Sequence, residues 1–475
     1  MDTQKLRQRI LDLAIRGKLV PQDPNDEPAS VLLDRIRAEK ERLIAEGKIK
    51  RPRSKKSTDK SHYQQFTPPF DIPESWEWVR LEEIAKIGTG ATPIKSNREY
   101  YDGSINWVSS SVTSSPYVDV PTDFITELAL KETNCEIYPI GTLLMAMYGE
   151  GKTRGQVTEL RIEAASNQAC AAIIPYIPTT KNFVKLYLLA NYYQLRRLAE
   201  GGNQPNLNLG KISSLYIPIP PKQEQQRILE QYKYIIESIE LIEKSKAFLE
   251  ERIDAVKSKI LDLAMQGRLV PQDPKDESAA YMLRRINPKA KIITDNPHYP
   301  QLPDNWAYLS LSDINTYKSS TVTPANMSKQ LFDLYSVPIF STLKPEKTHG
   351  SEIGSAKQVI KKGDVLLCKI NPHLNRVWEI IEDSDNVQIA SSEWIVVRSE
   401  LHNPAFLKWY FSSPNFRALL SSQVSGVGGS LTRAQPAIVK GYLVPVPPLE
   451  EQERISSEIE LWFNSLDNIN LSLTN

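Results

Sequence analysis

One short stretch of the sequence carries residues that could bind phosphate. GEGKTRG (149–155) contains Gly151, Lys152 and Thr153 in the order found at the end of a phosphate-binding loop. The full loop also requires a glycine where Ala146 stands, and Ala146 lies in an apolar run that predicts a strand. We therefore expect no nucleotide site here. A lysine and an arginine in a glycine-rich loop could instead contact a phosphate or a guanine edge of a nucleic acid, as Lys152 and Arg154 would, and a solvated loop is the alternative.

Other polar stretches could read bases in the same way. Side-chain amides pair bidentately with adenine in the major groove, so GGNQPNLN (201–208) is a candidate, as is INPHLNR (370–376) at the place corresponding to GEGKTRG. Polar turns and exposed loops are the alternatives. Six residues at the start of predicted strands could instead cap a strand or turn: Ser166, Asn167, Gln168, Ser391, Ser392 and Glu393. The candidate DNA contacts are Lys95, Asn97, Arg98, Tyr148, Lys152, Thr153, Arg154, Asn167, Gln168, Asn203, Gln204, Asn206, Lys369, Asn371, His373, Asn375, Arg376, Ser392, Ser430 and Thr432.

The sequence offers no catalytic or metal-binding pattern. FTPPF (66–70) resembles the motif of adenine methyltransferases, but Thr67 replaces the Asp or Asn that must accept hydrogen bonds from the target amine. The five histidines lack paired spacing, so we expect no metal site and no cofactor in this chain.

Two bodies of α+β character are predicted to position these loops. They cover residues 61–219 and 296–446, and in each short β-rich runs alternate with helical ones. Gly141 corresponds to Gly363, the stretch ASNQACAAII to ASSEWIVV, and GGNQPNLN to GVGGSLTR. Between these matching segments the residues of the two bodies are largely unrelated. The pattern is typical of two copies of one recognition domain that bind different targets, because loop residues can change without affecting the core.

A segment outside the bodies is repeated almost word for word. ILDLAIRGKLVPQDPNDE (10–27) recurs as ILDLAMQGRLVPQDPKDE (260–277), and YIPIPPKQEQQRI (216–228) recurs as LVPVPPLEEQERI (443–455). The first pair is offset by 250 positions and the second by 227. The repeated segment is therefore unbroken in the middle of the chain, at 220–287, and split between 447–475 and 1–47 at the two ends. This order is that of a circularly permuted repeat.

The repeated segment predicts a long helix. Apolar residues from Ile228 to Leu263 recur at steps of four and three, and Gly17 and Gly267 suit helix C-caps. We expect the central helix to pair antiparallel with the terminal pieces as a coiled coil between the two bodies. A seam that dimerises with another molecule is the alternative. The basic run at 48–60 is expected to be a solvated linker, with contact to the DNA backbone as its alternative.

Composition sets outer limits. The 475 residues call for two or three domains, and a net charge of +1 means that any nucleic-acid binding must come from local patches. Three separated cysteines, the polar start and the lack of a long apolar run favour a cytoplasmic protein without disulfides.

The motifs together resemble the specificity (S) subunit of type I restriction-modification systems over essentially the full chain. The resemblance rests on IPESWEWVRLEEIAKIGTG (72–90), the two Pro-Pro motifs, GGNQPNLN and RGKLVPQDPNDEPA (16–29). It implies two target recognition domains, held apart by an antiparallel pair of conserved helices, that read a bipartite DNA target with an unspecified gap. It also implies two modification subunits that methylate adenine N6 with S-adenosylmethionine, and restriction subunits that use ATP and Mg for translocation and cleavage. This chain would choose the sequence and perform no chemistry. The alternatives are a protein-only scaffold and a self-sufficient enzyme that uses the Lys152 loop.

Overall fold

The computed structural model describes residues 2–51, 67–149, 151–199, 206–293, 302–425 and 432–474. The chain divides into two compact units, Asp2–Lys244 and Ser245–Asn475, which we describe one at a time. Of the predicted contacts, Asn203, Gln204 and Ser430 lie outside the described residues, as does most of the basic linker. None of the described helices is both long enough and apolar enough to cross a bilayer.

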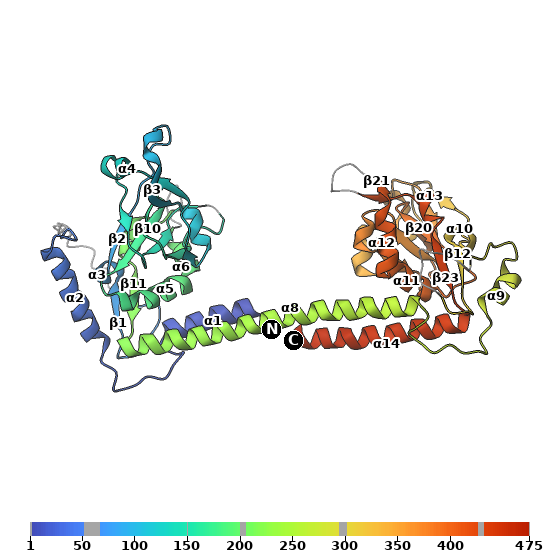
Figure 1. The fold of residues 1–475 in the computed structure, drawn as a ribbon, viewed down its shortest axis with the longest axis horizontal. Helices are drawn as coiled ribbons and strands as arrows, with labels where there is room; N and C mark the ends of the chain where they lie inside the picture. The colour runs from blue at the N-terminus through green and yellow to red at the C-terminus, as the bar shows by residue number, and fades with distance from the viewer. Residues whose placement is uncertain are drawn as a thin grey trace. The chain divides into compact units, whose positions relative to one another are not determined.

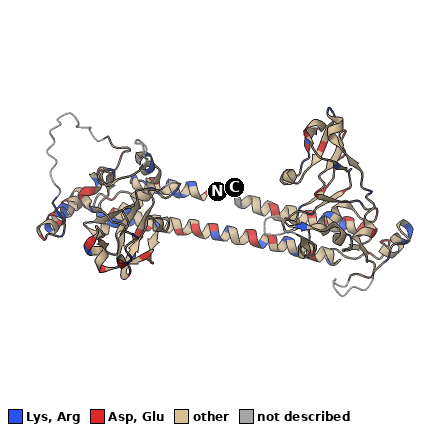
Figure 2. Ribbon diagram, turned by 90° about the horizontal axis from the view of Figure 1, so that it is seen from above, with Lys and Arg blue, Asp and Glu red and all other residues tan. Residues whose placement is uncertain are grey.

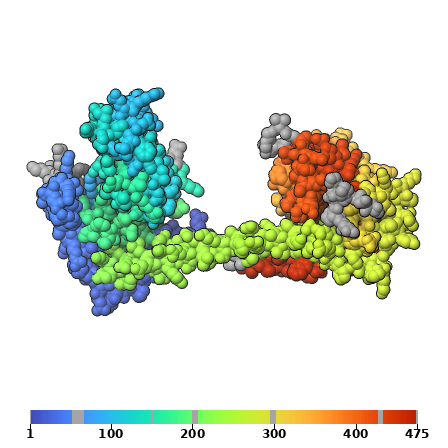
Figure 3. Space-filling model, in the orientation of Figure 1, coloured from blue at the N-terminus to red at the C-terminus, as the bar shows by residue number. Residues whose placement is uncertain are grey.

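The body of the first unit is built on two sheets (Figure 1). One has the order β2-β10-β7-β8-β4 and the other β5-β3-β9-β6, while β1 and β11 form a separate pair that joins the beginning and end of the body. In Figure 3 the part that carries β3, β5 and α4 projects from the rest of this body. The strands are β1 (Glu77–Arg80), β2 (Ala85–Thr89), β3 (Tyr101–Val108), β4 (Tyr117–Val118), β5 (Asp123–Ile125), β6 (Ile137–Tyr138), β7 (Leu143–Ala146), β8 (Val157–Leu160), β9 (Ala164–Ser166), β10 (Cys170–Pro175) and β11 (Tyr216–Ile219). The helices are α1 (Thr3–Ile15), α2 (Ala29–Ala45), α3 (Leu81–Ile84), α4 (Glu127–Glu132), α5 (Lys181–Ala190), α6 (Tyr192–Ala199) and α7 (Leu209–Ser213).

The body of the second unit repeats this framework. Its three-stranded sheet β18-β17-β20 has the order of β8-β7-β10, and its sheet β15-β14-β19-β16-β13 contains the order of β5-β3-β9-β6, again with one parallel pair in the middle. The strands are β12 (Ala307–Ser310), β13 (Thr321–Val322), β14 (Leu331–Tyr335), β15 (Glu346–His349), β16 (Lys357–Val359), β17 (Val365–Cys368), β18 (Val377–Glu379), β19 (Val387–Ala390), β20 (Trp394–Val397), β21 (Val424–Ser425), β22 (Arg433–Ala434) and β23 (Leu443–Val446). The helices are α9 (Ala279–Ile286), α10 (Leu311–Ile314), α11 (Pro404–Ser412), α12 (Pro414–Ser422) and α13 (Pro436–Val439). The predicted α+β class and shared framework are confirmed.

The predicted long helix is α8 (Lys222–Met265), along which acidic and basic residues are interspersed (Figure 2). In the first unit it runs antiparallel to α1, since Arg7 pairs with Glu243 while Ala14 packs near Ile228. In the second unit it runs antiparallel to α14 (Leu449–Thr474), since Ile260 packs with Ile455 while Lys257 pairs with Asp467. The antiparallel pairing is therefore found in each unit. Helix α8 does not fill the whole predicted segment 220–287, because it ends at Met265 and α9 is a separate helix.

The two copies of the repeated segment end their helices identically. Gly17 and Gly267 both have φ +66°, a left-handed conformation that glycine adopts without strain. A Cβ at Gly17 would lie 2.5 Å from Cγ of Pro73, and one at Gly267 would lie 2.4 Å from Cγ of Pro303. The predicted C-caps are confirmed, and the same glycines allow each helix end to pack against the start of its body.

Candidate nucleic-acid interface

Backbone hydrogen bonds bring three of the predicted reading segments together in the first unit. The loop 147–155 follows β7, the turn 167–169 joins β9 to β10, and residues 206–208 precede α7. The amide of Met147 donates to the carbonyl of Ala169 at 2.8 Å, and the amide of Leu207 donates to the carbonyl of Met147 at 3.0 Å. Segments up to 60 positions apart in the sequence thus form one edge of the body. We call it the reading edge, because its segments are predicted to read bases, and we call 147–155 the first reading loop.

The second unit uses the same connections. The amide of Lys369 donates to the carbonyl of Glu393 at 3.1 Å, and the amide of Ala434 donates to the carbonyl of Lys369 at 2.8 Å. The loop 369–376 after β17 therefore meets the β19–β20 turn and residues 432–434, as its counterpart does in the first unit. The correspondence between GEGKTRG and INPHLNR, inferred from sequence, holds in the structure.

Several predicted contacts present their side chains at the surface of these loops. Lys152 projects from the first loop and His373 from the second, and both are exposed. The exposed candidates are Lys95, Arg98, Tyr148, Lys152, Gln168, His373 and Ser392, and the half-buried ones are Asn97, Thr153, Arg154, Asn167, Asn206, Lys369, Asn371, Asn375, Arg376 and Thr432. Gln168 also connects the loop of Lys95 to the edge, because its side-chain oxygen accepts a hydrogen bond from the Thr92 hydroxyl at 2.6 Å.

Four predicted asparagines instead use their side chains to shape their own loops. Asn97 accepts from the amide of Glu99, and Asn167 from the amide of Ala169. Asn371 accepts from the amide of Thr432 at 2.9 Å, and Asn375 donates to the carbonyl of Ser412 at 2.8 Å. Asn371 and Asn375 also have positive φ, of 46° and 49°, which asparagine tolerates better than most residues. These amides hold the reading edge in shape. Their contact with bases remains a prediction.

Sequence reasoning missed one more segment at this edge. The turn η2 (Ser110–Ser114) follows the parallel strand β3, and the Thr113 hydroxyl lies 3.4 Å from the side-chain oxygen of Gln156, at the end of the first reading loop. In the second unit, η5 (Pro338–Thr342) follows β14 at the equivalent position. The hydroxyl-rich run SSSVTSS (109–115) was the available signal. The run alone did not predict a place at the edge, because that place follows from the parallel pairing of β3 with β9.

A buried carboxylate joins α8 to the body of the first unit. Glu224, 1% exposed, accepts hydrogen bonds from Trp76 Nε1 at 2.8 Å and from Gln22 Nε2 at 2.5 Å. One turn later, Arg227 forms an ion pair with Asp26. Gln22 and Asp26 belong to the repeated LVPQDPxDE stretch, so that stretch fastens each helix to its body. Trp76 is thus both a buried packing residue and a hydrogen-bond donor.

The second unit repeats this junction residue by residue. Glu451, fully buried, accepts from Trp306 Nε1 at 3.0 Å and from Gln272, while Arg454 pairs with Asp276. Burial raises the pKa of both Glu224 and Glu451 above the ordinary carboxyl value.

The junction predicts a pH dependence of stability. A carboxyl whose pKa is raised in the fold contributes stability below its ordinary value of 4.5, and this contribution is lost as the pH rises through the raised value. We expect the double variant Glu224→Gln, Glu451→Gln to escape this loss. The melting temperature of the variant minus that of the parent should therefore increase as the pH rises from about 4.5 to 7. Thermal unfolding followed at several pH values measures this difference. A difference that does not change with pH would contradict the assignment.

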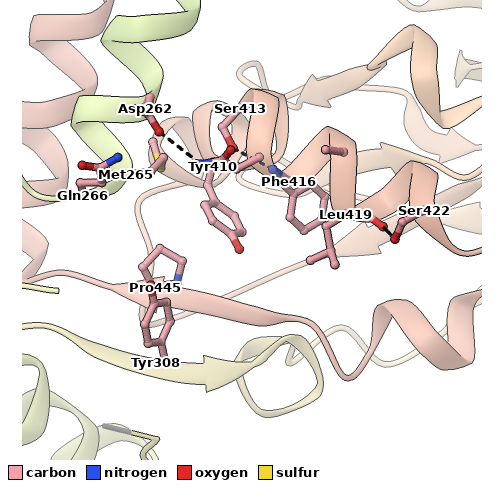
Figure 4. Close-up of a pocket in the computed structure, with 12 residues that line it drawn as sticks. Asp262, Met265, Gln266, Tyr308, Tyr410, Ser413, Phe416, Leu419, Ser422 and Pro445 are labelled. Atoms are coloured by element: carbon pink, nitrogen blue, oxygen red, sulfur yellow. Dashed lines mark hydrogen bonds between the residues drawn. The ribbon is translucent and has the colours of Figure 1, made fainter. Parts of the chain in front are cut away.

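A cavity of about 580 Å³ lies in the second unit (Figure 4). Its lining includes Met265 at the end of α8, the following residue Gln266, and Phe416 of α12. Tyr308 and Pro445 come from the paired strands β12 and β23. None of the predicted DNA contacts lines it, so it is not part of the candidate interface.

Comparison with known proteins shows which family the chain is similar to. Residues 73–251 match the family model described as "Type I restriction modification DNA specificity domain". The chain is 25% identical to the EcoEI specificity subunit of a type I restriction enzyme from Escherichia coli, over 98% of this chain and 90% of that protein. It is 29% identical to the EcoAI specificity subunit of Escherichia coli, over 66% of this chain and 62% of that protein.

Two solved structures share the fold. One is described as "Structural basis underlying complex assembly and conformational transition of the type I R-M system"; it has a TM-score of 0.55 at 14% identity and covers 86% of this chain and 94% of its own. The other is the HsdS subunit from Thermoanaerobacter tengcongensis, with a TM-score of 0.50 at 15% identity, covering 85% of this chain and 93% of its own.

Proposed function

Because the chain belongs to the family of type I restriction-modification specificity subunits, we propose that it selects the DNA sequence on which a type I complex acts, reading a bipartite target with an unspecified gap. The observation that carries the proposal is that each of the two bodies has a reading edge built in the same way. Two bodies with one strand framework present differently composed loops at the same place, Lys152 and Arg154 in one and His373 and Arg376 in the other. Each edge then reads one half of the target.

The exposed apolar residues of the long helices support docking of two modification subunits. In the first unit α8 leaves Tyr234 and Leu241 two-thirds exposed. In the second unit Phe248 of α8 and Leu461 and Trp462 of α14 are about half or more exposed. Exposed apolar side chains mark surfaces that bind other proteins where they form a contiguous patch. The repeated segment allows the two copies of one partner to be bound in equivalent ways.

We assign no catalytic step to this chain. In the proposal the modification subunits methylate adenine N6 with S-adenosylmethionine, and restriction subunits use ATP and Mg to translocate and cleave DNA. The assembly works in the cytoplasm, in keeping with the free thiols of Cys135, Cys170 and Cys368.

Selection from random DNA tests the proposal. The chain would be purified with its modification subunits, mixed with a library of random duplexes, and the retained DNA sequenced. We expect two short fixed sequences separated by a constant gap. Retention without a shared sequence would contradict the proposal and favour a protein-only scaffold.

The two edges are expected to act independently. Arg154→Ala should lower discrimination at one or more positions of the first half-site, and Arg376→Ala at the second, by about 5- to 150-fold, the range for a lost arginine–guanine contact. The same selection with each variant measures this. If both variants select the parental sequence unchanged, these two arginines are not readers.

A further inference from the structure

The first reading loop is made of residues that do not define its shape by themselves. Gly149, Gly151 and Gly155 have φ of +125°, +65° and +84°, so three of the seven positions 149–155 have a backbone that glycine adopts more readily than other residues. Such a chain has many accessible conformations, and ordering it costs conformational entropy. Backbone hydrogen bonds from Gly155 to Ala146 and from Gln156 to Thr153 close the base of the loop. The directions of Lys152 and Arg154 also depend on contacts that come from outside the loop.

Helix α6 supplies two such contacts. The Tyr192 hydroxyl donates to the carbonyl of Lys152 at 2.5 Å, and Arg196 Nη1 donates to the carbonyl of Arg154 at 3.0 Å. Arg196 also lies over the Tyr192 ring, 5.5 Å from its centroid. Because the two residues are four apart, they occupy neighbouring places on one face of the helix. The loop residue Gly155 packs against this face, where an added Cβ would lie 3.5 Å from Arg196 Cγ.

In the second unit the corresponding loop, 369–376, is held by its own side chains. There the loop residue Asn375 donates to the carbonyl of Ser412 at the end of α11, and Asn371 accepts from the amide of Thr432. Its anchoring side chains lie within the loop. In the first unit they lie 40 residues further along the chain, on a helix that no motif had singled out.

We propose that Tyr192 and Arg196 are positioning residues that determine which bases the first half-site must contain. This inference rests on the proposed function and names a determinant of its specificity. The carbonyls that they hold belong to Lys152 and Arg154, so the two hydrogen bonds orient the peptide groups on which these side chains stand. Without them the loop samples several shapes, and a lysine or arginine that reaches more than one base edge no longer discriminates between bases.

The experiment compares the bipartite sequence selected by the complex for four variants. Tyr192→Phe removes one hydroxyl and Arg196→Ala one guanidinium, each with its hydrogen bond to the loop. Tyr193→Phe and Arg197→Ala are the matched controls on the same helix; both side chains are exposed, and neither has a described hydrogen bond to the loop. Arg196→Lys, which keeps the charge and a donor, tests for partial rescue.

We expect Tyr192→Phe and Arg196→Ala to lower discrimination in the first half-site about tenfold, roughly the worth of one hydrogen bond, and to leave the second half-site and the gap unchanged. A first half-site that keeps its discrimination in both variants would overturn the inference. Equal loss at both half-sites would overturn it too, because it would show general destabilisation. If the parental complex selects no bipartite sequence, the proposed function itself fails.

Discussion

Replacing Ile260 with aspartate is expected to lower the free energy of unfolding of the second unit by about 3 kcal/mol or more. Ile260 is 7% exposed, and its cluster contains Ile455 and Ile459 of α14 together with Trp306 and Phe406 of the body. A carboxylate there would be buried among apolar groups without a partner. The helix pair and its junction with the body should therefore loosen together, as chemical denaturation would show.

The control for this variant is Val256→Asp. Val256 lies one turn earlier on α8 and is 44% exposed, so its carboxylate would stay in water. We expect this change to alter stability by less than about 0.5 kcal/mol. Equal effects of the two substitutions would contradict the antiparallel pairing of α8 with α14.

Replacing Trp76 with alanine is expected to lower the stability of the first unit by about 3–5 kcal/mol. The indole is 3% exposed, lies edge-on to Phe183 with ring centroids 5.7 Å apart, and donates to Glu224. The substitution both opens a cavity and removes a donor from a buried carboxylate. Trp76→Phe separates the two effects, because it keeps most of the volume and should cost about 1–3 kcal/mol.

A matched surface change completes this test. Tyr234→Ala removes a large ring that is 66% exposed on α8, and we expect it to leave the free energy of unfolding nearly unchanged. The account would be contradicted if Trp76→Phe were as stable as the parent, since Glu224 would then not need the indole donor.

Sequence periodicity was sufficient to predict the framework. The heptad series through Ile228 and Ile260 defined α8, and Gly267 marked where the helix ends. The unequal offsets of the repeats predicted that α8 would find a partner helix in each unit. These features follow from local rules of helix formation, which is why one sequence was enough.

The reading edge was predicted only in part. Polar composition pointed to loops that the structure brings together, yet it could not separate side chains that face solvent, such as His373, from those that shape the loop, such as Asn371. That distinction depends on hydrogen bonds between segments about 60 positions apart. The anchoring role of Tyr192 and Arg196 was hidden for the same reason, since their helix reads as an ordinary amphipathic one.

The central claim is tested most directly by mapping N6-methyladenine across a genome. The chain would be co-expressed with its modification subunit in a bacterial host that lacks adenine methylation, and the DNA read by single-molecule sequencing. We predict a new bipartite motif that appears only when this chain is present and has adenine targets in both halves. A stable complex that leaves no motif, or a motif that persists without this chain, would contradict the account.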